Sequence, residues 1–304
     1  MIQPRSPSRH RFIAVAVLTT LILGITAAAG TRALFARDRH FLWNVDTAQG
    51  RVTIMGSIHT LRDDAYPLPA VYERAYSDAE GLVFETDMAR MEEPAVQARL
   101  LALGLNPEGG TLRDRLSPDA YETLAEALGE RGLPPEQFAP FKPWFCAFTL
   151  TLLELQRLGY QPRNGLDRHF FNKAARDGKT LYHLESVEAQ IRLLASLEQG
   201  GQEAFLLQSL QELDLLGSKA AEMTEAWRTG DTGGLDAFIR MSFEGFPDLY
   251  DRFIVQRNRN WLPLIEDLIR DGENVLVIVG AGHLVGDEGL VQLLEDRGHR
   301  LEQQ

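Results

Sequence analysis

Two short apolar runs, one near each end of the chain, finish in the same four-residue pattern. The segment 51–60 reads RVTIMGSIHT and the segment 274–283 reads NVLVIVGAGH, so each apolar run is followed by Gly-x-x-His. Short apolar runs that are rich in Val and Ile and bounded by glycine are typical of buried strands. Strands of this kind at both ends favour one sheet to which both ends contribute, and this constrains the fold more than any other feature.

Strand-like and helix-like segments alternate outside a long helical middle. Residues 40–60 predict a hairpin with its turn near Gly50, and residues 81–87 and 180–185 predict two further strands. After residue 274 the chain returns to strand, turn, helix and strand. We therefore expect an α/β (α+β) fold, with a central, mostly parallel sheet formed from both ends of the chain and a large helical insertion.

The helical middle covers about residues 187–270 of a domain that we place at residues 38–304. Its helices are expected to break at glycines, namely Gly200–Gly201, Gly217, Gly230–Gly234 and Gly245–Pro247. Ser117 followed by proline predicts the start of an earlier helix. The residue pattern 88–105 also predicts a helix. We expect the helical middle to cover a site on the sheet and to select its substrate.

The charge of the chain argues against nucleic acid as a partner. The formal net charge is −12 and the isoelectric point is about 5.1. A general nucleic-acid binder needs a basic surface to neutralise phosphates. The hydrophobic content of 44% is ordinary for a folded protein that buries a core.

The N-terminal segment, residues 1–37, has the features of an export signal or a membrane anchor. Arg5, Arg9 and Arg11 precede an apolar run at residues 12–30 that ends in small residues. A basic flank followed by an apolar stretch is typical of a signal peptide, and this run is just long enough for one membrane span. The arginines predict a cytoplasmic N-terminus. We expect the domain to be periplasmic or anchored to the inner membrane, outside the cytoplasm.

The chain has a single cysteine, Cys146, so no disulfide can form within it. Cys146 lies in an apolar helical stretch that offers no positive group to stabilise a thiolate. We expect a buried, unreactive thiol and not a nucleophile.

Four apolar runs each finish on a residue that can bind a metal or move a proton: His59, Glu85, Glu185 and His283. The carboxyl ends of parallel strands meet at one edge of a sheet, where ligands bind in open α/β proteins. If the four strands are parallel, two imidazoles and two carboxylates converge there. The glycines before each histidine are expected to permit a sharp turn of the backbone (Gly56, Gly280 and Gly282).

Two imidazoles and two carboxylates suit a divalent ion such as Zn, Mn, Co or Fe. A metal with an open position could acidify a bound water and polarise a carbonyl, and one glutamate could instead act as a general base. Taken singly, each histidine is more typical of a hydrogen-bonded or surface residue, and each glutamate of a charge at a helix N-terminus. Their joint placement favours a shared site.

Other patterns are less specific. Arg257, in the segment RNRN, is expected either on a solvated helix face or turned into the site to hold a carboxylate or an oxyanion. His183 should share a strand face with Glu185. The segment GAGHLVG lacks the third glycine of a dinucleotide loop, and HExxH and GxSxG are absent from the chain. Trp227 is expected in the core at a helix end.

Five segments, in order along the chain, resemble the TraB/GumN family. They read GSIHT, GLVFETD, NGLDRHFFNKAARDGKTLYHLESVEAQ, RNRNW and VIVGAGHLVGDEGLVQLLEDRGHRL, and they span the chain from about Phe41 to its C-terminus. This family is similar to the Tiki proteases and, more distantly, to haem-binding ChaN and the erythromycin esterases. Its paired Gly-x-x-His motifs and two glutamates fall on the four residues that end the apolar runs. Its Arg-Asn pair falls on Arg257 and Asn258, and its Gly-hydrophobic-Asp motif on Gly165, Leu166 and Asp167.

The Tiki relatives are membrane-tethered, metal-dependent peptidases that act outside the cytoplasm. The resemblance therefore implies a metal-dependent hydrolase of the cell envelope, most concretely a peptidase or amide hydrolase with a peptide or protein substrate. It implies a divalent ion (Mn, Co or Zn) held by His59, His283, Glu85 and Glu185. It also implies catalytic roles for the two glutamates and for Arg257, and a role for Arg257 and Asn258 in binding the substrate.

Two other functions stay open at this point. A non-catalytic module could hold haem, iron or an exported saccharide at the same edge, as the distant relatives indicate, and haem would need an apolar slot beside an axial ligand. The third possibility is an envelope scaffold whose site is vestigial.

Overall fold

The computed structural model describes residues 39–47, 50–198 and 201–304. The predicted export signal or anchor at residues 1–37 lies outside the described residues. Within the described part of the chain, no helix has the length and apolar character needed to cross a membrane.

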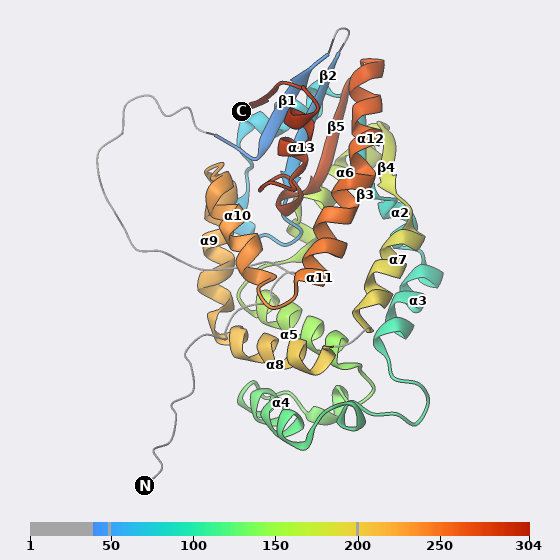
Figure 1. Ribbon diagram of the computed structural model, residues 1–304, viewed down its shortest axis with the longest axis vertical. Helices are drawn as coiled ribbons and strands as arrows, with labels where there is room; N and C mark the ends of the chain where they lie inside the picture. Colours follow the sequence, from blue (N-terminus) through green and yellow to red (C-terminus); the bar gives the residue numbers. More distant parts are fainter. Residues whose placement is uncertain (1–38, 48–49, 199–200) are drawn as a thin grey trace, which may run out of the picture.

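A six-stranded sheet is built from both ends of the chain, as predicted (Figure 1). Its strand order is β4-β3-β5-β2-β1-β6, and the four neighbours β4, β3, β5 and β2 are parallel. Strand β1 is antiparallel to β2, in the hairpin that was expected, and β6 is antiparallel to β1. The strands are β1 (Leu42–Asp46), β2 (Arg51–Ser57), β3 (Gly81–Thr86), β4 (Thr180–Glu185), β5 (Val275–Gly280) and β6 (Leu301–Gln303).

The register of the parallel strands brings their carboxyl ends to one edge. Ser57 of β2 pairs with Gly280 of β5, and Thr86 of β3 pairs with Glu185 of β4. The central strands are buried on both faces, which is why they read as continuous apolar runs. The segments that follow β2, β3, β4 and β5 therefore leave the sheet side by side.

Six α-helices lie between β2 and β4 in the chain, with β3 following the first of them. The predicted helix at 88–105 is two helices, because Glu93 is extended and Pro94 begins a new first turn. Ser117 caps its helix as predicted, its Oγ accepting from the Ala120 N–H at 3.3 Å. The helices are α1 (Ala70–Asp78), α2 (Met88–Met91), α3 (Pro94–Gly104), α4 (Pro118–Glu130), α5 (Pro143–Arg157) and α6 (Leu166–Asp177).

The helical middle follows β4, and in Figure 1 α8 packs with α5 below the sheet while α12 runs alongside it. The predicted break at Gly217 was wrong, since Gly217 lies in the first turn of α9 and a 3₁₀ segment, Leu213–Leu215, joins α8 to α9 directly. Its helices are α7 (Val187–Ala195), α8 (Gln202–Glu212), α9 (Leu216–Arg228), α10 (Thr232–Ser242), α11 (Pro247–Tyr250) and α12 (Gln256–Asp271), with a π-helix at Asp251–Val255 before α12 and α13 (Leu290–Asp296) near the C-terminus.

Trp227 and Cys146 are both buried, as expected. Trp227 ends α9 against the sheet, and its indole N–H donates to the Gly56 carbonyl at 2.8 Å, which ties the helical middle to β2. Burial raises the pKa of the Cys146 thiol to about 12, so the thiolate is not formed at neutral pH.

Candidate functional site

The four residues predicted from the strand ends lie at the same edge of the sheet. Glu85 and Glu185 are at the ends of β3 and β4, and His283 closes a short 3₁₀ turn directly after β5. These three side chains are largely buried, whereas the side chain of His59, two residues after β2, is 62% exposed. The sequence therefore located a real cluster, in which His59 is the member closest to solvent.

Arg257 of α12 joins three of the four residues. One terminal nitrogen, Nη2, donates to Oε2 of Glu85 and, at 2.8 Å, to Oε1 of Glu185. Its Nε donates to the same Glu185 oxygen at 3.1 Å, and its Nη1 lies 2.9 Å from Nε2 of His283. The Arg257 side chain is only 12% exposed, so the alternative of a solvated helix face was wrong.

The π-helix before α12 contributes to this placement. The wide turn at Asp251–Val255 leaves the carbonyl of Phe253 near Arg257, whose Nη1 donates to it at 3.4 Å. Helices with such an extra residue in a turn recur at functional sites because the insertion re-aims the side chains that follow. The guanidinium also lies over the ring of Trp261, with Cζ 4.4 Å from the ring centroid.

Each carboxylate has further donors besides Arg257. Glu85 accepts from the backbone N–H of Gly280 at 2.6 Å. Glu185 accepts from Nε2 of Gln190 at 2.6 Å and from the indole N–H of Trp261 at 3.2 Å. Burial is the largest single influence and would raise the pKa of Glu85, but the Arg257 guanidinium, the two neighbouring histidines and the Gly280 N–H together outweigh it and hold that pKa well below its usual range. Glu85 is therefore an anion at any ordinary pH.

Asn258 fixes the tautomer of His283. Asn258 is fully buried, and its side-chain N–H₂ donates to the carbonyls of His283 at 3.1 Å and Glu288 at 2.7 Å. Its Oδ1 must then face Nδ1 of His283, 2.7 Å away, so Nδ1 carries the hydrogen. Nε2 is left as an acceptor for Arg257. Burial, with Arg257 adding to it, lowers the pKa of His283 to about 3, so the ring is neutral.

His59 is paired with Asp167 at the N-terminus of α6. Its Nδ1 lies 3.3 Å from Oδ1 of Asp167, and the charge of Asp167 raises the pKa of His59 to about 9. The neighbouring backbone holds the loop in place, because the Leu166 N–H donates to the Ile58 carbonyl at 3.0 Å. A side chain on Gly165 would clash with the His59 carbonyl, which is a physical reason for glycine there.

The glycines before the two histidines do not serve the sharp turn that the sequence predicted. None of them has a positive φ, and Gly280 is in an ordinary extended conformation. They are needed for space instead: a Cβ on Gly56 would lie 3.1 Å from Ala281, and one on Gly282 would lie 2.7 Å from Ile239. The two loops that present the histidines pack closely against each other and against α10.

These residues form the floor of a cavity of about 250 Å³, whose walls come from the helical middle. Four site residues face it: His59, Glu85, Arg257 and His283. Its walls are almost entirely apolar, and they include Leu193, Leu194, Met223, Leu235, Ile239, Phe253 and Ile254. His183, by contrast, is exposed on the edge strand β4 and is not among the residues that line the cavity.

A model of the TraB/PrgY/gumN family matches residues 41–303, which include every residue of this site. The chain belongs to the TraB/PrgY/gumN family. The resemblance predicted from the five sequence segments is thereby confirmed over nearly the whole described chain.

Two curated relatives align with most of this chain. The uncharacterized protein YbaP of Escherichia coli (strain K12) is 27% identical over 262 residues, which cover 85% of this chain and 94% of that protein. The uncharacterized protein YbaP of Shigella flexneri is 26% identical over 262 residues, which again cover 85% of this chain and 94% of that protein. No solved structure matches the chain.

The family resemblance implies a metal, and the two imidazoles of the site are oriented to suit one. Nδ1 of His283 is hydrogen-bonded to Asn258 and Nδ1 of His59 is ion-paired with Asp167, so a ligand would reach each ring through Nε2. To bind a metal there, His59 must first lose its proton and His283 must leave Arg257. These groups surround one small region beside Gly280. A Cβ added to Gly280 would lie 3.6 Å from Nε2 of His59, 3.3 Å from Oε1 of Glu85 and 3.6 Å from the ring of His283. Histidines that bind metals are usually held by a second group in this way, and the donor set fits a divalent cation in kind.

Arg257 lies among these donors. In the part of the chain that the structure describes, no three His, Cys, Asp or Glu side chains are grouped closely enough to hold a metal as they stand. The guanidinium takes up Nε2 of His283 and one oxygen of Glu85. A cation could join both donors only if Arg257 gave up its contact with His283.

Sequence reasoning missed two residues of the site. Trp261 and Gln190 both donate to Glu185, and Trp261 also packs its ring on His283, with centroids 4.6 Å apart. A signal for Trp261 existed, since it is one turn beyond Arg257 on the same helix and shares its face. Gln190 lies one turn into α7, directly after Glu185, in a position that sequence alone does not distinguish from a surface residue.

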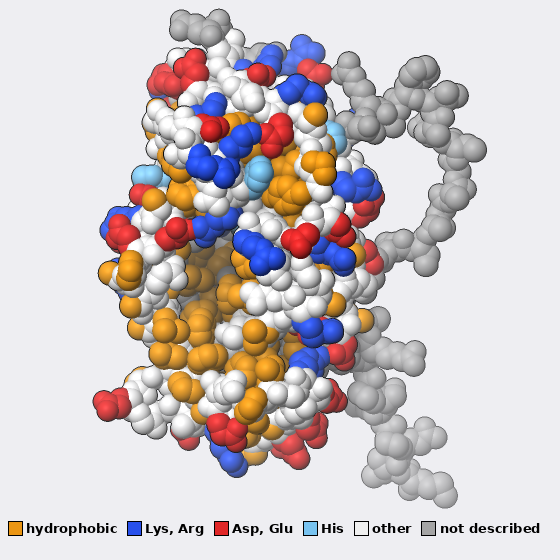
Figure 2. Space-filling view, turned by 180° about the vertical axis from the view of Figure 1, so that it is seen from behind, with side chains coloured by type: hydrophobic (Ala, Val, Ile, Leu, Met, Phe, Trp, Pro, Cys, Tyr) orange, Lys and Arg blue, Asp and Glu red, His pale blue; other side chains and the backbone are white. Residues whose placement is uncertain are grey.

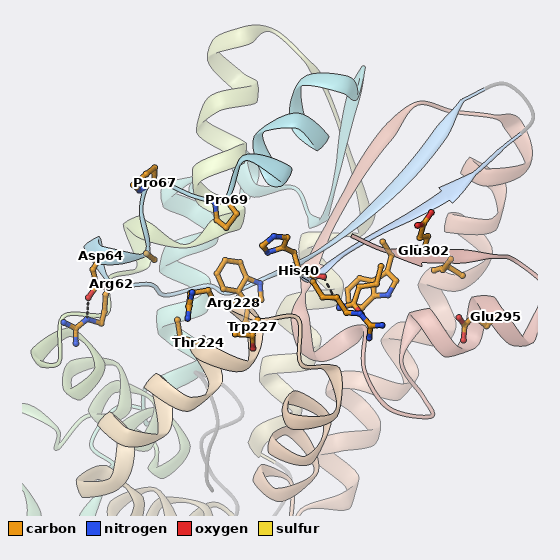
Figure 3. A pocket seen from close by; sticks show the side chains of 16 residues that line it. His40, Arg62, Asp64, Pro67, Pro69, Thr224, Trp227, Arg228, Glu295 and Glu302 are labelled. Atoms are coloured by element: carbon orange, nitrogen blue, oxygen red, sulfur yellow. Dashed lines mark hydrogen bonds and ion pairs between the residues drawn. The ribbon is translucent and has the colours of Figure 1, made fainter. Parts of the chain in front are cut away.

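A second, larger cavity of about 1490 Å³ lies elsewhere, between α9 and the β1–β6 edge of the sheet (Figure 3). His40, Trp227 and Arg228 are among the side chains around it. Two of its arginines are engaged with nearby carboxylates, Arg228 with Glu225 at 2.7 Å and Arg62 with Asp64 at 3.3 Å. None of the residues predicted from the strand ends lines it.

Proposed function

We propose that this protein is a metal-dependent hydrolase of the cell envelope that cleaves peptide or amide bonds. One observation carries the proposal: Arg257 joins Glu85, Glu185 and His283, which come from three strand ends. Together with His59 from a fourth strand end, Arg257, Glu85 and His283 line the charged floor of an otherwise apolar cavity. Clustered ionisable side chains with strongly shifted pKa values, in a concave site at the carboxyl edge of a parallel sheet, are a recognised feature of catalytic centres.

His59, His283 and Glu85 are the residues that would hold the ion. When bound, a divalent cation would supply an acidified water and a Lewis acid for the carbonyl of the scissile bond. Asp167 and Asn258 orient the two imidazoles through Nδ1, so that Nε2 of each ring is presented to the floor.

Arg257 and Glu185 have a different role in this proposal. Glu185 holds the guanidinium through both Nε and Nη2, and Gln190 and Trp261 hold Glu185 in turn. Nη1 is the nitrogen that can turn from His283 towards an oxygen of the substrate. A preorganised cation at that place stabilises the negative charge that develops on a carbonyl oxygen during hydrolysis.

Metal content is the first test. The full chain is dialysed, reloaded with Mn, Co or Zn in turn, and analysed for bound metal, together with the double variant His59→Ala/His283→Ala. We expect one divalent ion in the wild type and none in the double variant. His183→Ala is the matched control, because His183 is exposed and outside the cavity. Full metal occupancy in the double variant would contradict the assignment, and absence of metal from the wild type would contradict the metal requirement.

Activity is tested with the metal that binds, on a peptide library. We expect cleavage by the wild type and a loss of cleavage in Arg257→Lys and Glu85→Gln, with far-ultraviolet circular dichroism to confirm that both variants fold. Absorbance in the Soret region after addition of haem distinguishes the binding-module alternative: a Soret band that depends on His59 or His283 would favour haem as the ligand.

The envelope location is part of the proposal and rests on the basic flank and apolar run of residues 1–37. A fusion of alkaline phosphatase after residue 38 is expected to be active in bacteria, because that reporter folds only outside the cytoplasm. An inactive fusion that accumulates in the cytoplasm would contradict it.

A further inference from the structure

The cavity above the site has walls of one chemical kind. Those that rise from the charged floor are aliphatic or aromatic, and they come from four elements of the helical middle: α7, α9, α10 and the π-helix. Gln190 is the polar exception there, and its side-chain N–H₂ is engaged by Glu185 at 2.6 Å. Within the described residues of that wall, no charged side chain faces the cavity. Hydrophobic side chains also gather in a hollow on the face of the molecule shown in Figure 2.

We infer that the cavity receives a bulky apolar side chain next to the bond that is cleaved, so that the substrates are peptides or amides with residues such as Leu, Ile or Phe at that position. This inference rests on the proposed hydrolase function and names its substrate class. Apolar walls with a few polar groups at one end are the usual construction of a pocket that orients a ligand by its polar end.

The size of the cavity supports a single large side chain. Its volume is about 250 Å³. An apolar cavity of about 150 Å³ in another protein stays dry and accepts benzene. The space here therefore accommodates one aromatic ring or one branched aliphatic group, and leaves room at the floor for the atoms of the scissile bond.

The apolar walls exclude substrates with a charged side chain at this position and disfavour those with a small one. A Lys, Arg, Asp or Glu side chain placed among these walls would lose its hydration and find no partner, which is strongly unfavourable. The charges of the site are all at the floor, where Arg257 is already paired with both Glu85 and Glu185. A small side chain such as Ala would leave most of the apolar wall without contacts.

Ile239 and Leu194 are the wall residues best placed to set this preference. Ile239 of α10 packs directly against the loop that carries His283, since a Cβ on Gly282 would lie 2.7 Å from its Cδ1. Leu194 of α7 is only partly buried, so a larger side chain there can extend into the cavity without displacing the core. Shortening Ile239 enlarges the pocket near the floor, and enlarging Leu194 fills it.

The experiment compares cleavage of matched peptides that carry Phe, Leu, Ala or Lys beside the scissile bond, by the full-length, metal-loaded protein. We expect kcat/KM to be at least about tenfold higher for Phe and Leu than for Ala, and cleavage to be lowest for Lys, in line with typical discrimination by apolar pockets. Leu194→Trp should lower kcat/KM for Phe about tenfold and leave Ala nearly unchanged. Ile239→Ala should shift the preference towards larger side chains. Leu264→Trp, at an exposed leucine of α12 outside the cavity, is the matched control.

Binding is measured in parallel, by NMR titration with N-acetyl-phenylalaninamide and N-acetyl-lysinamide, so that this inference and the proposed function can fail separately. Cleavage with equal rates for Phe, Ala and Lys overturns the inference and leaves the hydrolase standing. No cleavage, combined with binding of the phenylalanine amide that Leu194→Trp weakens, supports the apolar ligand class and contradicts the hydrolase. If neither cleavage nor binding is observed, both the inference and the proposed hydrolase function are overturned. Far-ultraviolet circular dichroism of both wall variants confirms that they fold.

Discussion

Nε2 of His283 lies 2.9 Å from Nη1 of Arg257, and this contact places the arginine at the centre of the site. The guanidinium carries the positive charge there, while the imidazole stays neutral and offers it a lone pair. Because Asn258 holds the opposite ring nitrogen, the pair has only one hydrogen-bonding arrangement. The same lone pair is the one that a divalent cation would use.

Removal of Arg257 should destabilise the folded protein strongly. Arg257→Ala leaves two buried carboxylates without their common counter-ion, and breaking a buried ion pair in this way typically costs about 3–5 kcal/mol. Arg259→Ala is the control two residues along the same helix, where an exposed pair with Glu288 contributes less than about 1 kcal/mol. Urea denaturation measures both. Equal destabilisation by the two variants would contradict the central role of Arg257.

The two histidines should give the free energy of unfolding a maximum near pH 6.5. The pKa of His59 is about 9 in the folded protein against 6.5 unfolded, so its contribution is complete below pH 6.5 and is lost as pH rises through 9. The pKa of His283 is about 3 folded against 6.5 unfolded, so its contribution is present above pH 6.5 and is lost as pH falls towards 3.

Chemical denaturation at a series of pH values tests these two slopes. His283→Gln should flatten the fall between pH 6.5 and 5, which for one proton is at most about 1.4 kcal/mol per pH unit. His59→Gln should flatten the fall in the free energy of unfolding above pH 6.5. This fall should be shallower than the one below pH 6.5, because solvent screens the His59 side chain, which is 62% exposed.

Asp167 should control the charge of His59. In Asp167→Asn the main cause of the raised pKa is removed, so the pKa of His59 should fall from about 9 towards 6.5. A pH titration of the histidine ring protons by NMR measures it, with His169 as the internal reference, because its nearest carboxylate is Glu73. An unchanged pKa of His59 would show that Asp167 does not pair with it in solution.

The sequence was sufficient for the sheet and for the four strand-end residues, because the buried parallel strands carry a local signal. Ile54 and Val277 lie in continuous apolar runs, and such a run is expected where a strand is covered on both faces. Parallel pairing then determines, without further information, that Glu85 and Glu185 share an edge. The single helix predicted at residues 88–105 is divided in the structure because Pro94 begins a new first turn, a boundary that the apolar pattern does not show.

The position of Arg257 could not be predicted from the residues alone. It depends on how α12 is rotated about its axis, and the π-helix at Asp251–Val255, which leads directly into α12, has no sequence signal of its own. The role of the loop glycines was misjudged for a related reason. Gly56 and Gly282 are needed because segments distant in sequence approach them, which is a property of packing and not of the local backbone.

Gly280→Ala should impair the site without unfolding the protein. The φ of Gly280 is −53° and its ψ is 134°, a conformation that alanine adopts without strain. The added methyl, however, would lie 3.3 Å from Oε1 of Glu85 and 3.6 Å from both imidazole rings, in the region that those three donors surround. We expect the melting temperature to change by only a few degrees while the affinity for the divalent ion falls at least about tenfold, as for other changes close to metal ligands. Gly129→Ala is the control, since nothing beyond the backbone of its own helix lies within 4 Å of the added methyl. The extra helix propensity should stabilise α4 by about 0.5–1 kcal/mol. Isothermal titration with the metal gives the affinity, and unchanged affinity in Gly280→Ala would place the ion away from these three residues.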